Sequence, residues 1–89
     1  MPRLAFTGNL ERHVACPAEV VEGATVIEAL DAYFLRHPKV RSYVLDEQGA
    51  LRHHVTVFLD GTQLRERKHL SEAVRPETEI YVMQALSGG

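Results

Sequence analysis

Residues 25–37, Thr-Val-Ile-Glu-Ala-Leu-Asp-Ala-Tyr-Phe-Leu-Arg-His, carry the clearest helix signal in the chain. Thr25 lies three residues before Glu28, the spacing at which a hydroxyl and a carboxylate satisfy the free amides of a helix start. Apolar side chains then recur at helical spacing, and Pro38 disfavours helical geometry at His37. We therefore expect one helix that covers one face of a sheet with a stripe made of Val26, Ile27, Leu30, Tyr33, Phe34 and His37.

The residues before this helix predict an opening hairpin. Residues 3–7 alternate polar and apolar side chains and stop at Gly8-Asn9, a pair typical of turns. A second short strand is expected at residues 12–16, where Pro17 ends it because proline cannot donate to a β-ladder.

The residues after the helix predict further strands. Residues 51–59 are expected to form the longest one, and the Asp60-Gly61 pair predicts a hairpin turn into a short strand at residues 62–64. A last strand is expected at residues 79–84, after a connection in which Leu70 and Val74 pack. Alternation places one set of side chains inward, namely Leu51, Val55, Val57, Leu59, Ile80 and Val82, and another outward, namely His54, Thr56, Phe58, Tyr81 and Met83.

These elements predict an α+β fold, with a mixed sheet of four to five strands and one main helix packed on one face. The 89 residues leave room for one domain, expected at residues 1–84. Residues 85–89 are expected to form a flexible C-terminal tail that ends in Gly-Gly.

Composition disfavours several classes of partner. Ten basic and twelve acidic side chains give a net charge of −2, which does not predict the cationic face of a nucleic-acid-binding protein. No apolar run approaches the ~20 residues of a membrane span, and the first residues lack the apolar stretch of a signal peptide. Because the single Cys16 fits a reducing compartment, we expect a cytoplasmic protein without nucleic-acid or membrane partners.

The Gly88-Gly89 pair is the feature most informative about function. It has no side chains, so it can enter a narrow channel in extended form and present an unhindered carboxylate. A carboxylate is a poor electrophile until it is joined to AMP as a mixed anhydride, and the sequence has no G-x-x-x-x-G-K-[ST] loop with which to do so. Taken alone, the pair is also compatible with a frayed chain end.

Three segments and the glycine pair carry a family resemblance. The segments are residues 25–30 (Thr-Val-Ile-Glu-Ala-Leu), residues 54–61 (His-Val-Thr-Val-Phe-Leu-Asp-Gly) and Ile80-Tyr81-Val82. With Gly88-Gly89 they resemble the MoaD/ThiS family of ubiquitin-like β-grasp sulfur carriers. An additional hairpin at residues 45–52 is similar to the longer members, including the carrier of a cysteine-synthesis route. Two family features differ here, the run before the glycines (Gln84-Ala85-Leu86-Ser87) and the turn before the last strand (residues 75–79).

This resemblance implies a substrate of other enzymes rather than a catalyst. An E1-like enzyme would use ATP to adenylate the Gly89 carboxylate, and a sulfur donor would displace AMP to leave a thiocarboxylate. That group would deliver sulfur to a sulfur-accepting synthase, with the pathway open among molybdopterin, thiazole, cysteine and specialised metabolites. No permanently bound cofactor is expected. Two alternatives stay open, a ubiquitin-like protein modifier and a non-catalytic β-grasp interaction module.

The outward face of the sheet is the expected partner-binding surface. We expect Phe58, Tyr81 and Met83 to cluster there, with Leu86 at the base of the tail, because aromatic and methionine side chains are favoured at interfaces. The alternative is that a loop covers these side chains, or that their exposure has no function.

Other reactive side chains predict little chemistry. The five histidines, at positions 13, 37, 53, 54 and 69, do not have the spacing of a metal site. His53 and His54 are expected to point to opposite faces of a strand. Cys16 is either a small packed residue or a sulfur-accepting thiol. The charged residues 65–68 are expected to form a solvated loop.

Overall fold

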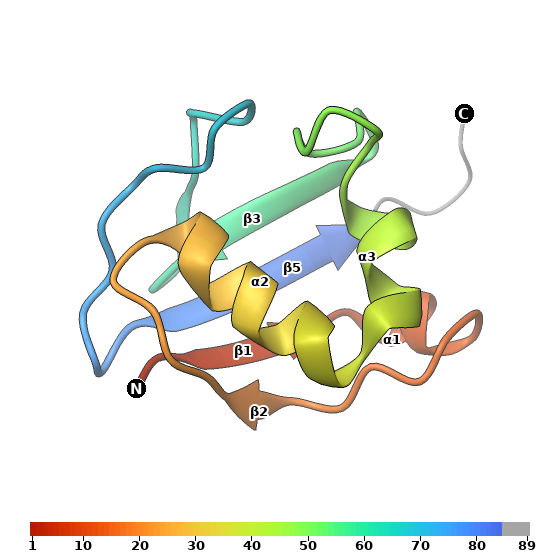
Figure 1. The fold of residues 1–89 in the computed structure, drawn as a ribbon, viewed down its shortest axis with the longest axis horizontal. Coiled ribbons are helices and arrows are strands. Elements are labelled where there is room, and N and C mark those ends of the chain that lie inside the picture. The colour runs from red at the N-terminus through yellow and green to blue at the C-terminus, as the bar shows by residue number, and fades with distance from the viewer. Residues whose placement is uncertain (85–89) are drawn as a thin grey trace.

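A mixed five-stranded sheet is covered on one face by helices in the computed structural model, which describes residues 1–84 (Figure 1). The elements are β1 (Arg3–Phe6), α1 (Gly8–Glu11), β2 (Glu19–Val20), α2 (Val26–Arg36), α3 (Pro38–Val44), β3 (Val55–Leu59), β4 (Thr62–Gln63) and β5 (Glu79–Gln84). The strand order is β2-β1-β5-β3-β4, in which β1 and β5 are parallel and the other neighbours are antiparallel. The predicted fold class is confirmed. The predicted tail, residues 85–89, lies outside the described residues.

Helix α2 begins and ends where the sequence predicts. Thr25 is extended and its Oγ1 accepts the backbone N–H of Glu28 at 3.3 Å, while the Glu28 carboxylate accepts the N–H of Ala24 at 3.0 Å. The helix ends at Arg36, and Pro38 begins α3 because its fixed φ suits the first turn of a helix. The sequence did not predict α3.

The core lies between α2 and the inner face of the sheet. Side chains at alternate positions of β1, β3 and β5 are buried against the apolar stripe of α2, and the rings of Phe6 and Tyr33 are 5.0 Å apart. The buried strand residues are Leu4, Phe6, Val55, Val57, Ile80 and Val82, and the buried helix residues are Val26, Ala29, Leu30, Tyr33 and Phe34. Leu70 and Val74 are also buried, as predicted, so the long connection before β5 closes one end of the core.

The predicted strand at residues 12–16 is wrong. Residues 8–11 form the short helix α1, which places Leu10 in the core, and the chain pairs with β1 only later, at Glu19–Val20. Between them the Tyr33 hydroxyl donates a 2.7 Å hydrogen bond to the carbonyl of Pro17. This contact holds the segment against α2 at Pro17, a position that local alternation does not indicate.

The strand predicted at residues 51–59 is shorter than expected. β3 spans Val55–Leu59, so β5 is the longest strand, and the predicted hairpin at residues 45–52 is reduced to one bridge between Leu45 and Leu51. Residues 53 and 54 form a turn, and the ring centroids of His53 and His54 are 5.3 Å apart. Contrary to the prediction, the two side chains therefore do not lie on opposite faces of a strand. The turn at Asp60-Gly61 is confirmed, since both residues have positive φ, as this hairpin type requires.

Candidate functional site

The outer face of the sheet carries the predicted apolar cluster. Phe58 lies directly opposite Tyr81 in the β3–β5 ladder, and Met83, two residues further along β5, lies opposite Thr56. Tyr81 is 38% exposed and Met83 is 39% exposed, while Phe58 is half-buried between them and the neighbouring strand. The structure therefore brings the three predicted residues together in the part of the chain that it describes.

These side chains line a shallow groove of about 520 Å³. The groove is bounded by Phe58, Asp60, Gly61, Glu79, Tyr81 and Met83. The carboxylate of Asp60 accepts the backbone N–H of Glu79 at 2.9 Å, and the carboxylate of Glu79 lies 3.9 Å from the guanidinium of Arg3. Both acidic groups at this end of the groove are therefore already engaged within the fold.

The other end of β5 is the root of the C-terminal segment. The backbone N–H of Gln84 donates to Thr7 Oγ1 at 3.3 Å, and the N–H of Thr7 donates to the carbonyl of Val82 at 3.1 Å. Thr7 therefore extends the β1–β5 pairing by one residue and holds the last residue that the structure describes. The sequence did not predict this contact, because the two residues lie far apart in the chain.

The side chain of Gln84, at the end of β5, has a polar atom that is unsatisfied within residues 1–84. Its side-chain oxygen is buried and finds no hydrogen-bond donor among residues 1–84. Leu86, Gly88 and Gly89, which the sequence predicts to act beyond this point, lie outside the described residues.

Cys16 has the environment of a packed residue. It is buried, and burial, together with the nearby negative charge of Glu11, raises the pKa of its thiol. A raised pKa disfavours the thiolate, which is the nucleophilic form of cysteine. The environment therefore favours the packing interpretation over a sulfur-accepting role.

The histidines do not assemble a metal site in the part of the chain that the structure describes. No group of three or more His, Cys, Asp or Glu side chains in residues 1–84 is arranged to hold an ion. His37 instead lies 2.8 Å from a carboxylate oxygen of Glu19, which also pairs with Arg36 at 3.1 Å. The hydrogen bond from His37, with that from Arg36, lowers the pKa of the Glu19 carboxyl. This cluster ties edge strand β2 to the end of α2.

The charged residues 65–68 are more than a solvated loop. The guanidinium of Arg67 donates to the carbonyls of Arg52 and Val55 at 2.8 and 2.6 Å, which fixes the start of β3. The carboxylate of Glu66 accepts backbone N–H groups of Lys68, His69 and Ser71, and these bonds lower its pKa to about 2. Residues 65–68 form a loop whose side chains are exposed or half-exposed, as predicted, and two of them also hold it against the fold.

A family model described as the ThiS family matches residues 11–89. The chain belongs to the ThiS family. The match includes β3, β5 and the Gly88-Gly89 pair, and it confirms the predicted resemblance. A comparison with curated proteins gave no match.

Solved structures share this fold over nearly the whole chain. SAMP1 from Haloferax volcanii is 28% identical, with a TM-score of 0.78, over 99% of this chain and 98% of that one. A chain in the Amycolatopsis orientalis BexX/CysO complex is 21% identical, with a TM-score of 0.83, over 100% of both chains. The small archaeal modifier protein 1 from Methanosarcina acetivorans is 18% identical, with a TM-score of 0.80, over 99% of this chain and 95% of that one.

The protein is therefore a β-grasp member of the ubiquitin-like sulfur carriers or modifiers. Among residues 1–84 there is no helix with the length and apolar character needed to cross a membrane.

Proposed function

We propose that this ThiS-family protein is a sulfur carrier that works through the carboxylate of Gly89. The observation that carries the proposal is the family match, which extends to the Gly88-Gly89 pair. Two residues without side chains are suited to a narrow catalytic channel, and the fold behind them supplies a surface by which a partner holds the chain. The proposal requires Gly89 to be the terminal residue of the active protein.

The chemistry needs a partner enzyme and ATP. The Gly89 carboxylate attacks the α-phosphorus of ATP, pyrophosphate leaves, and an acyl adenylate forms. Hydrosulfide then attacks the acyl carbon, the bond to AMP breaks, a proton is lost, and a thiocarboxylate remains. In this scheme the protein is a substrate, and ATP binds to an E1-like partner. The thiocarboxylate is a stronger nucleophile than the carboxylate because sulfur is more polarisable, so it donates sulfur to a synthase.

The proposed partner-binding residues are Phe58, Tyr81, Met83 and Leu86. The exposure of Tyr81 and Met83 supports this role, since aromatic and methionine side chains are enriched where proteins meet. We place the reaction in the cytoplasm, where the single Cys16 stays reduced.

Intact-mass spectrometry tests the proposal. The purified chain is incubated with the E1-like adenylating enzyme of its source organism, ATP and sulfide. We expect a mass gain equal to the difference between sulfur and oxygen, and no gain in a matched chain that lacks Gly88 and Gly89. An unchanged wild-type mass, with an enzyme that adenylates its own known carrier, would contradict the proposal.

Protein modification is the second candidate, and the likeness to SAMP1 from Haloferax volcanii supports it. A modifier forms an amide between Gly89 and a lysine Nζ of a target. Branched peptides that join these two atoms in cell extracts would favour the modifier. Thiocarboxylate formation without such peptides would favour the carrier.

A further inference from the structure

A second apolar surface lies at the edge of the sheet that β2 forms, away from the apolar cluster on the outer face. Three large apolar side chains outside that cluster are exposed in residues 1–84, namely Met1, Val20 and Leu35. Leu35, on α2, is 85% exposed, which is the highest value among them. Val20 belongs to β2, and Met1 precedes β1, with which β2 pairs. A single apolar side chain at the surface needs no explanation, but three around one edge indicate a binding surface.

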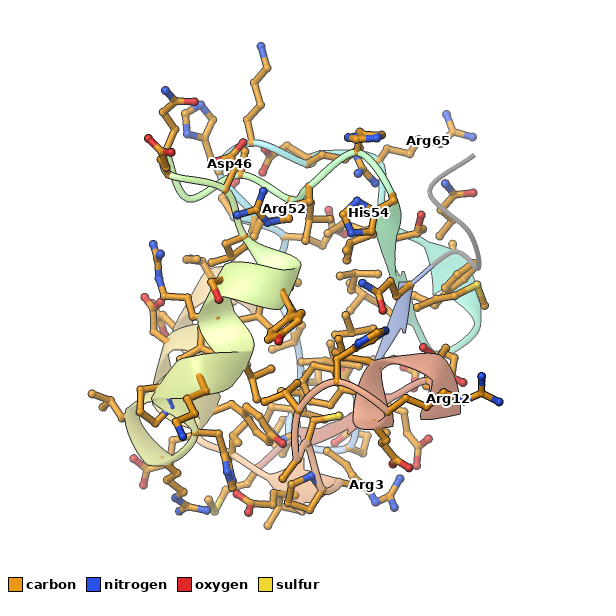
Figure 2. All side chains as sticks on the ribbon, turned by 90° about the vertical axis from the view of Figure 1, so that its right-hand side faces the viewer. Arg3, Arg12, Asp46, Arg52, His54 and Arg65 are labelled. Atoms are coloured by element: carbon orange, nitrogen blue, oxygen red, sulfur yellow. The ribbon has the colours of Figure 1, made fainter. Side chains whose placement is uncertain are left out.

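A hollow of about 290 Å³ lies between this edge and α2. It is lined by Met1, Val21, Glu22, Ala32, Leu35 and Arg36. Figure 1 shows β2 as the outermost strand on this side, with no other described element beyond it. Figure 2 shows Arg3, which pairs with Val20, and Arg65, which follows β4, at opposite ends of the molecule. The hollow therefore opens at the edge of the sheet farthest from β4.

The backbone of Val20 directs its hydrogen-bonding groups to the outer side of β2. In an antiparallel pair, successive residues direct their N–H and C=O groups to opposite sides. The N–H of Val21 donates to the carbonyl of Pro2 at 2.8 Å, so the groups of Val20 point away from β1. The N–H of Arg3, opposite Val20, correspondingly points away from β2 and donates to the carbonyl of Thr78 at 3.0 Å. No strand within residues 1–84 lies on the outer side of β2, so both groups of Val20 can pair with an added strand.

The charge around the hollow is negative. Four carboxylates and two cations lie at it or one helical turn away, namely Glu19, Glu22, Glu28 and Asp31, with Arg36 and the amine of Met1. Arg36 lies 3.1 Å from Glu19, so this pair adds no net charge, whereas Glu22 and Asp31 form no ion pair within residues 1–84. Lys39, the next cation along the chain, lines a different hollow beside His13. With His37 neutral, the carboxylates outnumber the cations by two, so this edge attracts a positively charged partner.

We propose that the β2 edge binds an extended, basic peptide segment of another protein. The segment lies beside β2, pairs its backbone with Val20, inserts one apolar side chain against Ala32 and Leu35, and places lysine or arginine next to the acidic rim. Strand addition of this kind takes its affinity from backbone hydrogen bonds and its specificity from side-chain pockets. A second copy of this chain fits less well, because a two-fold axis at β2 brings two acidic rims together. The inference concerns a surface that the proposed sulfur chemistry does not use.

A peptide titration tests the inference. The probe is a fluorescein-labelled peptide, Lys-Lys-Val-Ile-Val-Val-Lys-Lys, and fluorescence anisotropy follows its binding to the full chain. We expect saturable binding that weakens as salt is added. A peptide with glutamate in place of lysine tests the charge, and one with proline at the second and fourth apolar positions tests the backbone pairing, because proline has no N–H. We expect both control peptides to bind at least roughly ten-fold more weakly.

Variants of the chain locate the site. Leu35→Asp should weaken binding of the lysine peptide roughly ten-fold, although the added negative charge by itself attracts a basic peptide. Val20→Pro removes only the outward N–H, which makes no bond to β1, and should weaken binding about five-fold. Val20→Thr keeps this N–H and should bind like wild type, as should Tyr81→Asp on the outer face. Circular dichroism checks that each variant folds.

The inference is wrong if the wild-type chain does not bind the lysine peptide, or if Leu35→Asp binds it as tightly as wild type. Equal binding of the proline peptide would show that the backbone of Val20 is not paired, and would also overturn the inference. A dimer of the wild-type chain in analytical ultracentrifugation that Leu35→Asp dissociates would assign the edge to a second copy instead. The adenylation test is independent of these results, because Val20 and Leu35 lie outside the proposed partner-binding residues.

Discussion

The hydroxyl of Thr7 accepts the backbone N–H of Gln84, a residue 77 positions later in the sequence, at 3.3 Å. Thr7 occupies the position before α1 where a threonine side chain commonly caps the helix, yet its oxygen makes no such bond. The oxygen is directed instead to the end of β5. The start of the chain therefore fixes the point from which the C-terminal segment departs.

Replacing Thr7 by valine should weaken the attachment of the end of β5 to the residue that follows β1. Valine has nearly the same shape but no acceptor, so we expect the Gln84 amide to exchange with solvent about five-fold faster, since one neutral hydrogen bond contributes about 1 kcal/mol. Hydrogen exchange followed by NMR measures this. Thr7→Ser keeps the acceptor and should exchange like wild type, and equal protection in all three proteins would show that the contact is not important.

Replacing Tyr81 by aspartate should weaken association with the adenylating enzyme roughly 10- to 30-fold, because an exposed aromatic side chain at the centre of an interface contributes strongly. Leu35→Asp is the matched control, because Leu35 is 85% exposed on α2, on the opposite side of the sheet. Biolayer interferometry measures both affinities. If Tyr81→Asp binds as tightly as wild type, the outer face is not the docking surface.

Replacing Tyr33 by phenylalanine should destabilise the fold by about 1–2 kcal/mol, because the carbonyl of Pro17 loses its donor. For a domain of this size the expected decrease in Tm is about 5–10 °C. Tyr43→Phe removes a hydroxyl that makes no hydrogen bond within residues 1–84 and should change Tm little. Thermal unfolding followed by circular dichroism compares the two variants, and equal Tm values would exclude a role for the Tyr33 hydroxyl.

Glu66 should make stability depend on pH in the acid range. Its pKa is lowered in the folded protein to about 2, from an ordinary value of 4.5, so its contribution is present above pH 4.5 and is lost as pH falls toward 2. Glu66→Gln should therefore unfold at lower urea concentration than wild type at neutral pH, and the two curves should converge near pH 2. The exposed Glu72→Gln serves as control. A difference that stays constant with pH would contradict this assignment.

Gly23 should tolerate no side chain. It has a φ of +153°, and a Cβ there would lie 2.6 Å from the backbone nitrogen of Ala29 in α2. We expect Gly23→Ala to cost at least about 2 kcal/mol in the free energy of unfolding. Gly49→Ala also has positive φ but meets no atom within 4 Å, so it should cost about 1 kcal/mol. Urea unfolding of both variants measures the difference, and equal costs would show that the close approach to α2 is unimportant.

The parts of the fold that were predicted from sequence depend on neighbouring residues. The start of α2 needs only Thr25 and Glu28, and its end needs only Pro38. The Asp60-Gly61 turn and the alternation in β5 are equally local. The outward cluster of Phe58, Tyr81 and Met83 followed from that alternation, which is why this half of the candidate site could be predicted.

The parts that were missed depend on distant partners. β2 has only two residues, which is too short for a recognisable alternation of side chains. The hydrogen bond that holds the preceding segment joins Tyr33 to Pro17, 16 positions apart in the sequence, so no local pattern indicates where the strand lies. Arg67 binds the carbonyls of Arg52 and Val55, which lie 15 and 12 positions earlier, at the point where β3 starts. The sequence prediction of a strand at residues 51–59 could not include this distant contact and placed the start of the strand too early. Thr7 and its partner Gln84 illustrate the same limit at the root of the C-terminal segment.

The position of the Arg67 guanidinium has a consequence for self-association. Where β4 ends, the outer edge of β3 would offer a free carbonyl oxygen at Val55 to a strand from another molecule, but Arg67 already binds this carbonyl and that of Arg52, which precedes the strand. Exposed sheet edges with unpaired backbone groups are the usual starting points for amyloid, and a positive charge at the edge discourages it. A single loop arginine thus occupies backbone acceptors through which this side of the sheet could otherwise pair with a second molecule.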